Sequence, residues 1–303
     1  VDLWAIGALS ESCNGENLTE ILDLENAGAV AFSDGINPIW NSELLLKALQ
    51  YVQKFEGLVI NRAKDIHLSQ HSQMNEGKMS TTLGMNGEPS LSETIAVKRD
   101  LDILRYAGGR LHFSMLSTAE SVDLVKKAKK EGLNVTCDVA IHQLLYTEDA
   151  LQDYDSNYKV DPPLRSEKDR KALLKGLESG VIDAIVSAHN PQDPESKDLE
   201  FDLSTAGICS LPTFFSSLVN LSKDLPLELL LEKSSNGPRR ILGFEEVHIN
   251  EGSQAKLAII DPNKTWVFDK TNNPSKSINS PLFNSELTGK CVGIINGHFL
   301  IKN

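Results

Sequence analysis

The side chains most able to do chemistry stand where predicted β-strands end. The clearest case is the apolar run Ile182–Val186, which is typical of a buried parallel strand and leads into Ser187, Ala188 and His189. In a β/α barrel, the carboxyl end of each strand faces the active site. The residues at or just after the ends of other predicted strands are Asp34, Arg62, Met115 and His142. The sequence therefore predicts a pocket at these strand ends, with the small apolar Ala188 as its unexpected member.

A metal-dependent hydrolase on such a barrel needs His, Asp or Glu at several strand ends, converging on one ion. Only Asp34, His142 and His189 could be ligands here. Arg62 is a permanent cation, and Met115 is a poor ligand for a hard hydrolytic ion. As an alternative to metal binding, Asp34-Gly35 is typical of a turn, and each histidine is typical of a hydrogen-bonded residue in the wall of a pocket. The residues alone favour this structural interpretation over a working metal site.

Other catalytic motifs are absent from the sequence. There is no GxSxG, P-loop or GxGxxG, which argues against a serine hydrolase elbow, a nucleotide kinase and a Rossmann enzyme. His67 and His71 have the spacing of paired helical ligands, but no HExxH is present and the sequence that follows is rich in glycine. We therefore interpret this pair as a chance feature of a loop.

Composition excludes several classes of partner. The chain has 303 residues, a formal net charge of −12 and no basic block, so nucleic acid and anionic membranes are not expected partners. No apolar run is long enough to span a bilayer. The four cysteines are scattered without a CxxC, which indicates buried free thiols in a reducing cytosol and hence a cytoplasmic protein.

Strands and helices alternate along the chain, which is typical of parallel βαβ units and of an α/β protein. A closed barrel needs eight units and the sequence supplies six, so two N-terminal units are expected before Val1. The predicted strands are Val1–Leu9, Ala29–Ser33, Leu58–Asn61, Arg110–Met115, Asn134–Ala140 and Ile182–Ser187. The predicted helices are Leu18–Ala27, a helix capped by Asn41, Glu93–Tyr106, a helix capped by Ser117 or Thr118, and a helix capped by Ser166.

Two regions depart from this alternation. Residues 67–93 are rich in Gly and Met, and such a long irregular stretch predicts a lid, a binding loop or disorder, especially at 74–89. After about residue 245 the pattern changes to short strands, at Ala255–Ile260, Thr265–Phe268, Lys290–Asn296 and His298–Ile301. We expect a barrel over 1–245 and a small β domain over 246–303, with turns at Asp261-Pro262 and Asn296-Gly297.

The segment Lys159–Arg165 (KVDPPLR) has two interpretations. Its prolines fix the backbone and leave Lys159 and Arg165 near the rim of the barrel. They are either solvated cations of a rigid loop or part of a recognition loop for an anionic substrate, because Arg binds carboxylates in a bidentate manner. The residues do not decide between the two.

Over essentially its whole length the chain resembles the dihydroorotases of the amidohydrolase superfamily. The segments that carry the resemblance are GALSE, AVAFSDG, NEGKMSTTLGMNGEPSLSE, RLHFSMLST, GLNVTCDVAIHQLL, KVDPPLRSEKDRKALLKGLESGVIDAIVSAHNPQ and GSQAKLAIIDP. The resemblance implies a TIM-type β/α barrel with a small β-sandwich domain, zinc as the cofactor, and the interconversion of carbamoyl aspartate and dihydroorotate in pyrimidine biosynthesis. It also implies a His-x-His metal pair on a first strand that would lie before Val1.

Position by position, the resemblance implies that this chain lacks key residues. Arg62 and Met115 stand where the family has metal-binding histidines, and Ala188 replaces the catalytic Asp of an Asp-His-Ala-Pro-His motif. Asp161 stands where the family has Asn before two prolines, and His142-Gln143 where it has a His-His pair. Asp34 and His112 match the family. A methyl group cannot act as a general base, and Arg62 would repel a dication.

Three hypotheses follow from these substitutions. The first is a non-catalytic dihydroorotase-like protein with a structural or regulatory role, for which the family has precedents that support aspartate transcarbamoylase assembly; a homo-oligomer is also expected. In this hypothesis Arg62 pairs with Asp34, and no cofactor is bound. The second is an active zinc-dependent cyclic amidase that uses Asp34, His142 and His189. The third is a barrel that senses carbamoyl aspartate or dihydroorotate through Arg62, Lys159 and Arg165.

Overall fold

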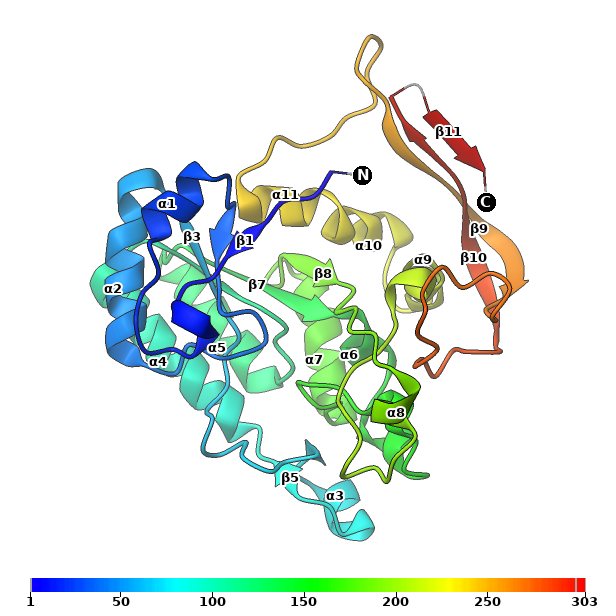
Figure 1. Ribbon diagram of the computed structural model, residues 1–303, viewed down its shortest axis with the longest axis horizontal. Helices are drawn as coiled ribbons and strands as arrows, with labels where there is room; N and C mark the ends of the chain where they lie inside the picture. The colour runs from blue at the N-terminus through cyan, green and yellow to red at the C-terminus, as the bar shows by residue number, and fades with distance from the viewer. Residues whose placement is uncertain (1, 298, 303) are drawn as a thin grey trace.

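Six parallel strands form one curved sheet in the computed structural model, which describes residues 2–297 and 299–302 (Figure 1). The strands lie side by side in chain order, and the six predicted strands are thereby confirmed. They are β1 (Ile6–Gly7), β2 (Ala31–Phe32), β3 (Leu58–Asn61), β6 (Arg110–Phe113), β7 (Val135–Ala140) and β8 (Ala184–Val186).

The first two strands are shorter than their apolar sequences predict. β1 and β2 pair with each other only through Ile6 with Ala31 and Gly7 with Phe32. Val1, where the first strand was expected to begin, lies outside the described residues. Backbone hydrogen bonds continue on both sides of these two pairs, from Val30 N to Ala5 O and from Leu9 N to Ser33 O, without forming further ladder pairs.

Helices alternate with these strands, as the sequence predicts. Helices α2, α4, α5 and α7 pack against one another in chain order beside the sheet (Figure 1). The helices are α1 (Ile21–Asn26), α2 (Ser42–Val52), α3 (Lys78–Leu83), α4 (Leu91–Ala107), α5 (Ala119–Lys130), α6 (Ile141–Leu145), α7 (Glu167–Glu178), α8 (Pro194–Lys197), α9 (Phe214–Leu221), α10 (Leu227–Ser234) and α11 (Asn236–Leu242). None of the helices in the described residues is long and apolar enough to cross a membrane.

Side-chain caps set the start of three of the predicted helices. Asn41 Oδ1 accepts hydrogen bonds from the backbone amides of Glu43 and Leu44, and Thr118 and Ser166 cap α5 and α7 in the same way. These caps are confirmed, with Thr118 rather than Ser117 starting α5. Helix α1 begins later than predicted, because Leu18 forms an isolated bridge with Ser10 instead of a helical turn.

The hydrophobic core lies between the parallel sheet and the helices. Strand residues Val59 and Leu111 pack with the helix residues Leu45, Leu49 and Val97, and each of these five side chains is fully buried. Burying a side chain of this size contributes about 1.5–3 kcal/mol relative to leaving it exposed. This core fixes the strand ends that carry the candidate site.

A buried carboxylate ties α4 to the start of α5. Glu93 is 3% exposed and accepts hydrogen bonds from the amide and hydroxyl of Ser117, at 3.0 and 2.5 Å, and from the amide and hydroxyl of Thr118, at 3.0 and 2.9 Å. We expect Glu93→Gln to lower the free energy of unfolding by about 2–3 kcal/mol, because an amide nitrogen would face donors. Urea denaturation measures the effect, and the exposed Glu120→Gln on the first turn of α5 is the control. Equal stability of the two variants would contradict this role.

The stretch 67–93 is folded around short elements, contrary to the expectation of an irregular loop. Strands β4 (Met74–Asn75) and β5 (Gly87–Glu88) pair in parallel and flank α3. Met74 is 1% exposed and packs with Leu151 and Phe201. A small apolar cluster therefore fixes this segment against residues that are distant in sequence, and the local sequence shows no sign of it.

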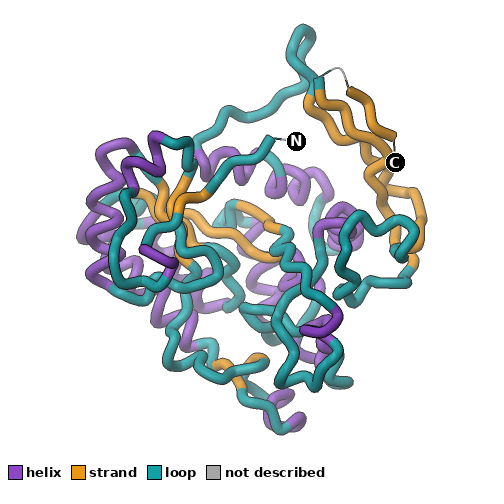
Figure 2. Tube along the Cα trace, viewed as in Figure 1, coloured by secondary structure: helices purple, strands orange, loops and turns teal. Residues whose placement is uncertain are grey.

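The C-terminal part forms a three-stranded antiparallel sheet, with β10 between β9 and β11. A connection over 243–255 separates the sheet from α11, and the sheet packs on α9 (Figure 2). Ser216 on α9 donates a hydrogen bond to the carbonyl of Gly289. The strands are β9 (Lys256–Val267), β10 (Glu286–Asn296) and β11 (Phe299–Lys302).

The predicted turn at Asp261-Pro262 is wrong, since β9 runs through it. β9 lies at the edge of the sheet, and Pro262 falls at a register shift, where a missing N–H breaks no ladder bond. The hairpin at Asn296-Gly297 is confirmed by the antiparallel pairing of Asn296 with Phe299. His298, where the last predicted strand begins, lies outside the described residues.

Candidate functional site

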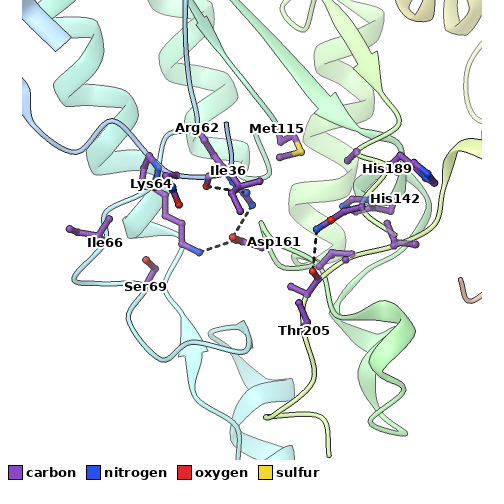
Figure 3. Close-up of a pocket in the computed structure, with 18 residues that line it drawn as sticks. Ile36, Arg62, Lys64, Ile66, Ser69, Met115, His142, Asp161, His189 and Thr205 are labelled. Carbon is purple, nitrogen blue, oxygen red and sulfur yellow. Dashed lines mark hydrogen bonds and ion pairs between the residues drawn. The ribbon is translucent and has the colours of Figure 1, made fainter. Parts of the chain in front are cut away.

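A cavity of about 560 Å³ opens at the carboxyl ends of the parallel strands (Figure 3). Its walls include Arg62 after β3, Met115 after β6, His142 after β7, and Ala188 and His189 after β8. The segment 159–165 contributes Asp161. Residues that follow four different strands thus meet in one pocket, as expected where parallel strands end together.

Arg62 is paired with Asp161. Its side chain is 4% exposed, and Nη2 lies 2.9 Å from Asp161 Oδ2. Lys64 Nζ lies 2.9 Å from the other carboxylate oxygen, Oδ1 (Figure 3), and 2.8 Å from Glu88 Oε2. Burial would raise the pKa of Asp161, but the charges of Arg62 and Lys64 outweigh burial and hold this pKa below its usual value. Asp161 is therefore an anion clamped between two cations.

Arg165 lies outside the pocket, contrary to expectation. It is among the largest fully buried side chains and donates hydrogen bonds to Ser117 Oγ at 3.0 Å, Asn75 Oδ1 at 3.0 Å and Glu88 Oε1 at 2.7 Å. Lys159 Nζ is likewise used, donating to the carbonyl of Phe201 at 2.6 Å. Both cations of the segment Lys159–Arg165 thus hold the protein's own loops together, instead of facing a ligand or solvent.

Asp34 also lies outside this pocket, in the wall of a neighbouring cavity of about 590 Å³. Its carboxylate accepts hydrogen bonds from the amide and hydroxyl of Ser10, at 2.8 and 2.5 Å. The predicted ion pair between Arg62 and Asp34 is wrong, because Ser10 satisfies Asp34 and Asp161 takes its place beside Arg62. Because the hydroxyl of Ser10 is neutral, its hydrogen bond to Asp34 does not require a second charged group to be buried beside the carboxylate.

His142 has no hydrogen-bond partner on either ring nitrogen, although it is only 3% exposed. Burial, together with the nearby charge of Arg62, lowers its pKa to about 3. The ring is therefore neutral at physiological pH. Its neighbour Gln143 donates to the carbonyls of Pro162 and Pro163, at 2.8 and 3.0 Å, and so anchors the segment that carries Asp161.

The other two histidines near the strand ends have partners. His189 Nδ1 accepts a hydrogen bond from the amide of Leu211 at 3.2 Å, and partial burial lowers its pKa. His112 contacts Asp138 Oδ2 through Nε2 and Thr136 Oγ1 through Nδ1, both at 2.8 Å. Both rings are thus used as structural hydrogen-bonding groups.

Sequence reasoning missed Lys64 and Glu88. Lys64 follows Arg62 by two positions, so in extended chain both side chains point to the same side, and this signal could have identified it. Glu88 gave no usable signal, because its partners Lys64 and Arg165 are distant in sequence and join it only through folding of 67–93.

The residues of this pocket do not fit a zinc ion. A catalytic zinc site needs three neutral or anionic protein ligands. Besides His142 and His189, the strand ends here offer a cation, a thioether and a methyl group, at Arg62, Met115 and Ala188. Within residues 2–297, no group of three or more His, Cys, Asp or Glu side chains is arranged to hold a metal.

The curved parallel sheet with a small antiparallel sheet is the fold of the amidohydrolase β/α barrels. The L-hydantoinase of Arthrobacter aurescens superposes with a TM-score of 0.81 at 23% identity, over all of this chain and 70% of that one. The dihydropyrimidinase of Brevibacillus agri gives a TM-score of 0.77 at 18% identity, over 92% of this chain and 65% of that one. At these identities the likeness defines the fold, a partial TIM-type barrel.

Sequence similarity defines the family more narrowly. A dihydro-orotase-like family model matches residues 3–121. The dihydroorotase of Syntrophus aciditrophicus is 37% identical over 294 residues, which are 96% of this chain and 69% of that protein. The dihydroorotase of Acetivibrio thermocellus is 36% identical over 307 residues, covering 100% of this chain and 72% of that protein. The chain belongs to the dihydroorotase family.

Proposed function

We propose that this chain is a non-catalytic member of the dihydroorotase family, with a structural or regulatory role in pyrimidine biosynthesis. The observation that carries the proposal is the buried Arg62–Asp161 ion pair at the strand ends, together with the methyl group of Ala188. Family chemistry closes or opens a cyclic amide and needs a group that accepts and returns a proton beside the reacting carbon.

Three of the described pocket residues are poorly suited to this step. Asp161 is held as an anion by two cations, which makes it a weak base. The nitrogens of His142 are shielded inside the wall. Ala188 carries nothing that can take a proton. A guanidinium in place of a metal ion also cannot activate water, because it neither binds an oxygen as a ligand nor releases a proton near neutral pH.

The alternative is an active zinc enzyme that uses Asp34, His142 and His189. Against it stands the position of Asp34, which is 2% exposed, bound to Ser10, and absent from the cavity that His142 and His189 share. A catalytic zinc needs these ligands within bonding distance of one ion. The non-catalytic assignment requires no rearrangement of these side chains.

Metal content and turnover, measured on one preparation of the full-length protein, test the proposal. With zinc supplied in excess and then dialysed away, we expect substoichiometric zinc and no dihydroorotate hydrolysis above background. The 37% identical Syntrophus aciditrophicus protein, treated in parallel, controls the assay. Stoichiometric zinc with turnover would overturn the proposal.

A non-catalytic protein of this family acts through what it binds. We propose a homo-oligomer or a complex with an aspartate transcarbamoylase as the working state. The four unpaired cysteines support a reducing compartment, the cytoplasm. Light scattering of the full-length protein, alone and with aspartate transcarbamoylase from the same cell, tests this role. A monomer that forms no complex would leave the role without support.

A further inference from the structure

A separate cavity, of about 660 Å³, lies where α9 meets the C-terminal sheet (Figure 1). Its described lining residues include none of those that line the pocket at the strand ends. The aromatic side chains of Phe214, Phe215 and Trp266 stand in its wall, and each of them is only partly buried. The volume is in the range typical of sites for small molecules. The cavity therefore has the size and the aromatic lining of a ligand site.

Strand β10 is distorted where it borders this cavity. Gly289, Lys290 and Cys291 all line it, although in a regular strand only alternate residues face the same side. The register with β9 shifts between Thr288 and Lys290, and again between Cys291 and Gly293. Irregularities of this kind re-aim side chains and are over-represented beside active sites. The two shifts account for the presence of both Lys290 and Cys291 in one wall.

The polar edge of Trp266 holds the indole in place. Nε1 donates hydrogen bonds to the carbonyl of Gly289 at 3.0 Å and to Ser216 Oγ at 3.2 Å. Gly289 has a φ of +91°, and a Cβ at this position would lie 2.6 Å from Val219 Cγ2, so β10 approaches α9 closely here. Because its nitrogen is already bonded, the indole offers a ligand its apolar face.

Lys290 brings a positive charge to this aromatic wall. Its Nζ lies 5.3 Å from the centre of the Trp266 ring. Asp261 lies opposite Lys290 on β9, but its Oδ1 accepts a hydrogen bond from the amide of Asn263. In the part of the chain that the structure describes, Lys290 forms no ion pair with this or any other carboxylate. The ammonium group can therefore accept an anionic partner while it stays over the ring.

We infer that this cavity binds a small aromatic carboxylate. The ring of the ligand packs against Phe215 and Trp266, and its carboxylate accepts a charge-assisted hydrogen bond from Lys290 Nζ. Partial burial strengthens this bond relative to one in open solvent. The inference goes beyond the proposed function and does not rest on it, because no residue of the strand-end pocket takes part.

We choose 1-naphthoate as the probe and 1-naphthamide as its uncharged counterpart. Calorimetric titration of the full-length protein should show one 1-naphthoate site, with 1-naphthamide bound at least about tenfold more weakly. Lys290→Gln should weaken 1-naphthoate binding at least about tenfold and leave 1-naphthamide binding unchanged. Lys290→Arg keeps the charge and should retain binding, which guards against misfolding of the glutamine variant. Lys264→Gln, at an exposed position on β9, is the matched control and should behave as the wild type.

Alkylation of Cys291 locates the bound probe. This thiol is partly exposed in the cavity wall, whereas Cys13 lies in the wall of a different cavity. With 1-naphthoate at about ten times its Kd, iodoacetamide should modify Cys291 about tenfold more slowly and Cys13 at an unchanged rate, as measured by peptide mass spectrometry. A folded wild type without saturable binding, binding that leaves Cys291 unprotected, or equal losses of affinity for both probes in Lys290→Gln would overturn the inference.

Discussion

Replacing Arg165 by methionine is expected to lower the free energy of unfolding by about 3–5 kcal/mol, the range found when one partner of a buried ion pair is removed. Arg165 is 1% and Glu88 3% exposed in their side chains, and Nη2 lies 2.7 Å from Oε1. The guanidinium also holds Asn75 and Ser117, so its loss leaves several buried polar groups without a partner. Equilibrium denaturation in urea measures the change.

Two controls separate this effect from a general loss of charge. Arg105 makes comparable contacts with Asp102 and Glu131 at an exposed site, so Arg105→Met should change stability by less than about 1 kcal/mol. The double variant Arg165→Met/Glu88→Leu should recover part of the lost stability, because the buried Glu88 carboxylate is removed together with its cation while Lys64 keeps Asp161. If the double variant is no more stable than Arg165→Met, the two residues are not coupled as the structure indicates.

The second large effect concerns His142 and pH. Its pKa is about 3 in the folded protein and about 6.5 in an unfolded chain. Below pH 6.5 the unfolded state binds a proton that the folded state does not take up until about pH 3. His142 therefore reduces stability as the pH falls, by up to about 1.4 kcal/mol per pH unit between about pH 6 and pH 4.

His142→Leu should remove this contribution and make the pH profile flatter than that of the wild type. At pH 7 it should also raise the free energy of unfolding by about 1–3 kcal/mol, because two buried nitrogens without hydrogen-bond partners are removed. Urea titrations at several pH values between 4 and 7 give both quantities. His248→Gln, at an exposed site, should leave the slope unchanged, and equal slopes for His142→Leu and the wild type would contradict the assignment.

Most strands and helices of the barrel could be predicted from local sequence signals. The strands Leu58–Asn61 and Val135–Ala140 are apolar runs, and Asn41 and Ser166 are polar caps before amphipathic helices, so each signal lies within a few residues. The C-terminal sheet was harder to predict, because Pro262 is compatible with β9 only through its edge position. The sequence does not reveal that position.

The members of the site that stand at strand ends were predictable, whereas Asp34 and Arg165 lie elsewhere and the partner of Arg62 was not foreseen. Strand ends placed Arg62, Met115, His142 and Ala188 in one wall, since parallel strands end together. The partner of Arg62 depends on the path of the segment carrying Asp161, which Gln143 fixes through its hydrogen bonds to the two prolines. Coulomb attraction alone does not choose between Asp34 and Asp161, because any nearby anion would serve.

Arg62 is buried beneath Asp161, and this arrangement makes the two positions unequal in the order in which they can change. Losing Asp161 first would leave the buried Arg62 without its counter-ion. Losing Arg62 first would leave Asp161, whose side chain is 37% exposed, still bound to Lys64. Replacing Arg62 is therefore expected to be tolerated better than replacing Asp161, so the order in which the two positions change decides whether the intermediate protein is stable.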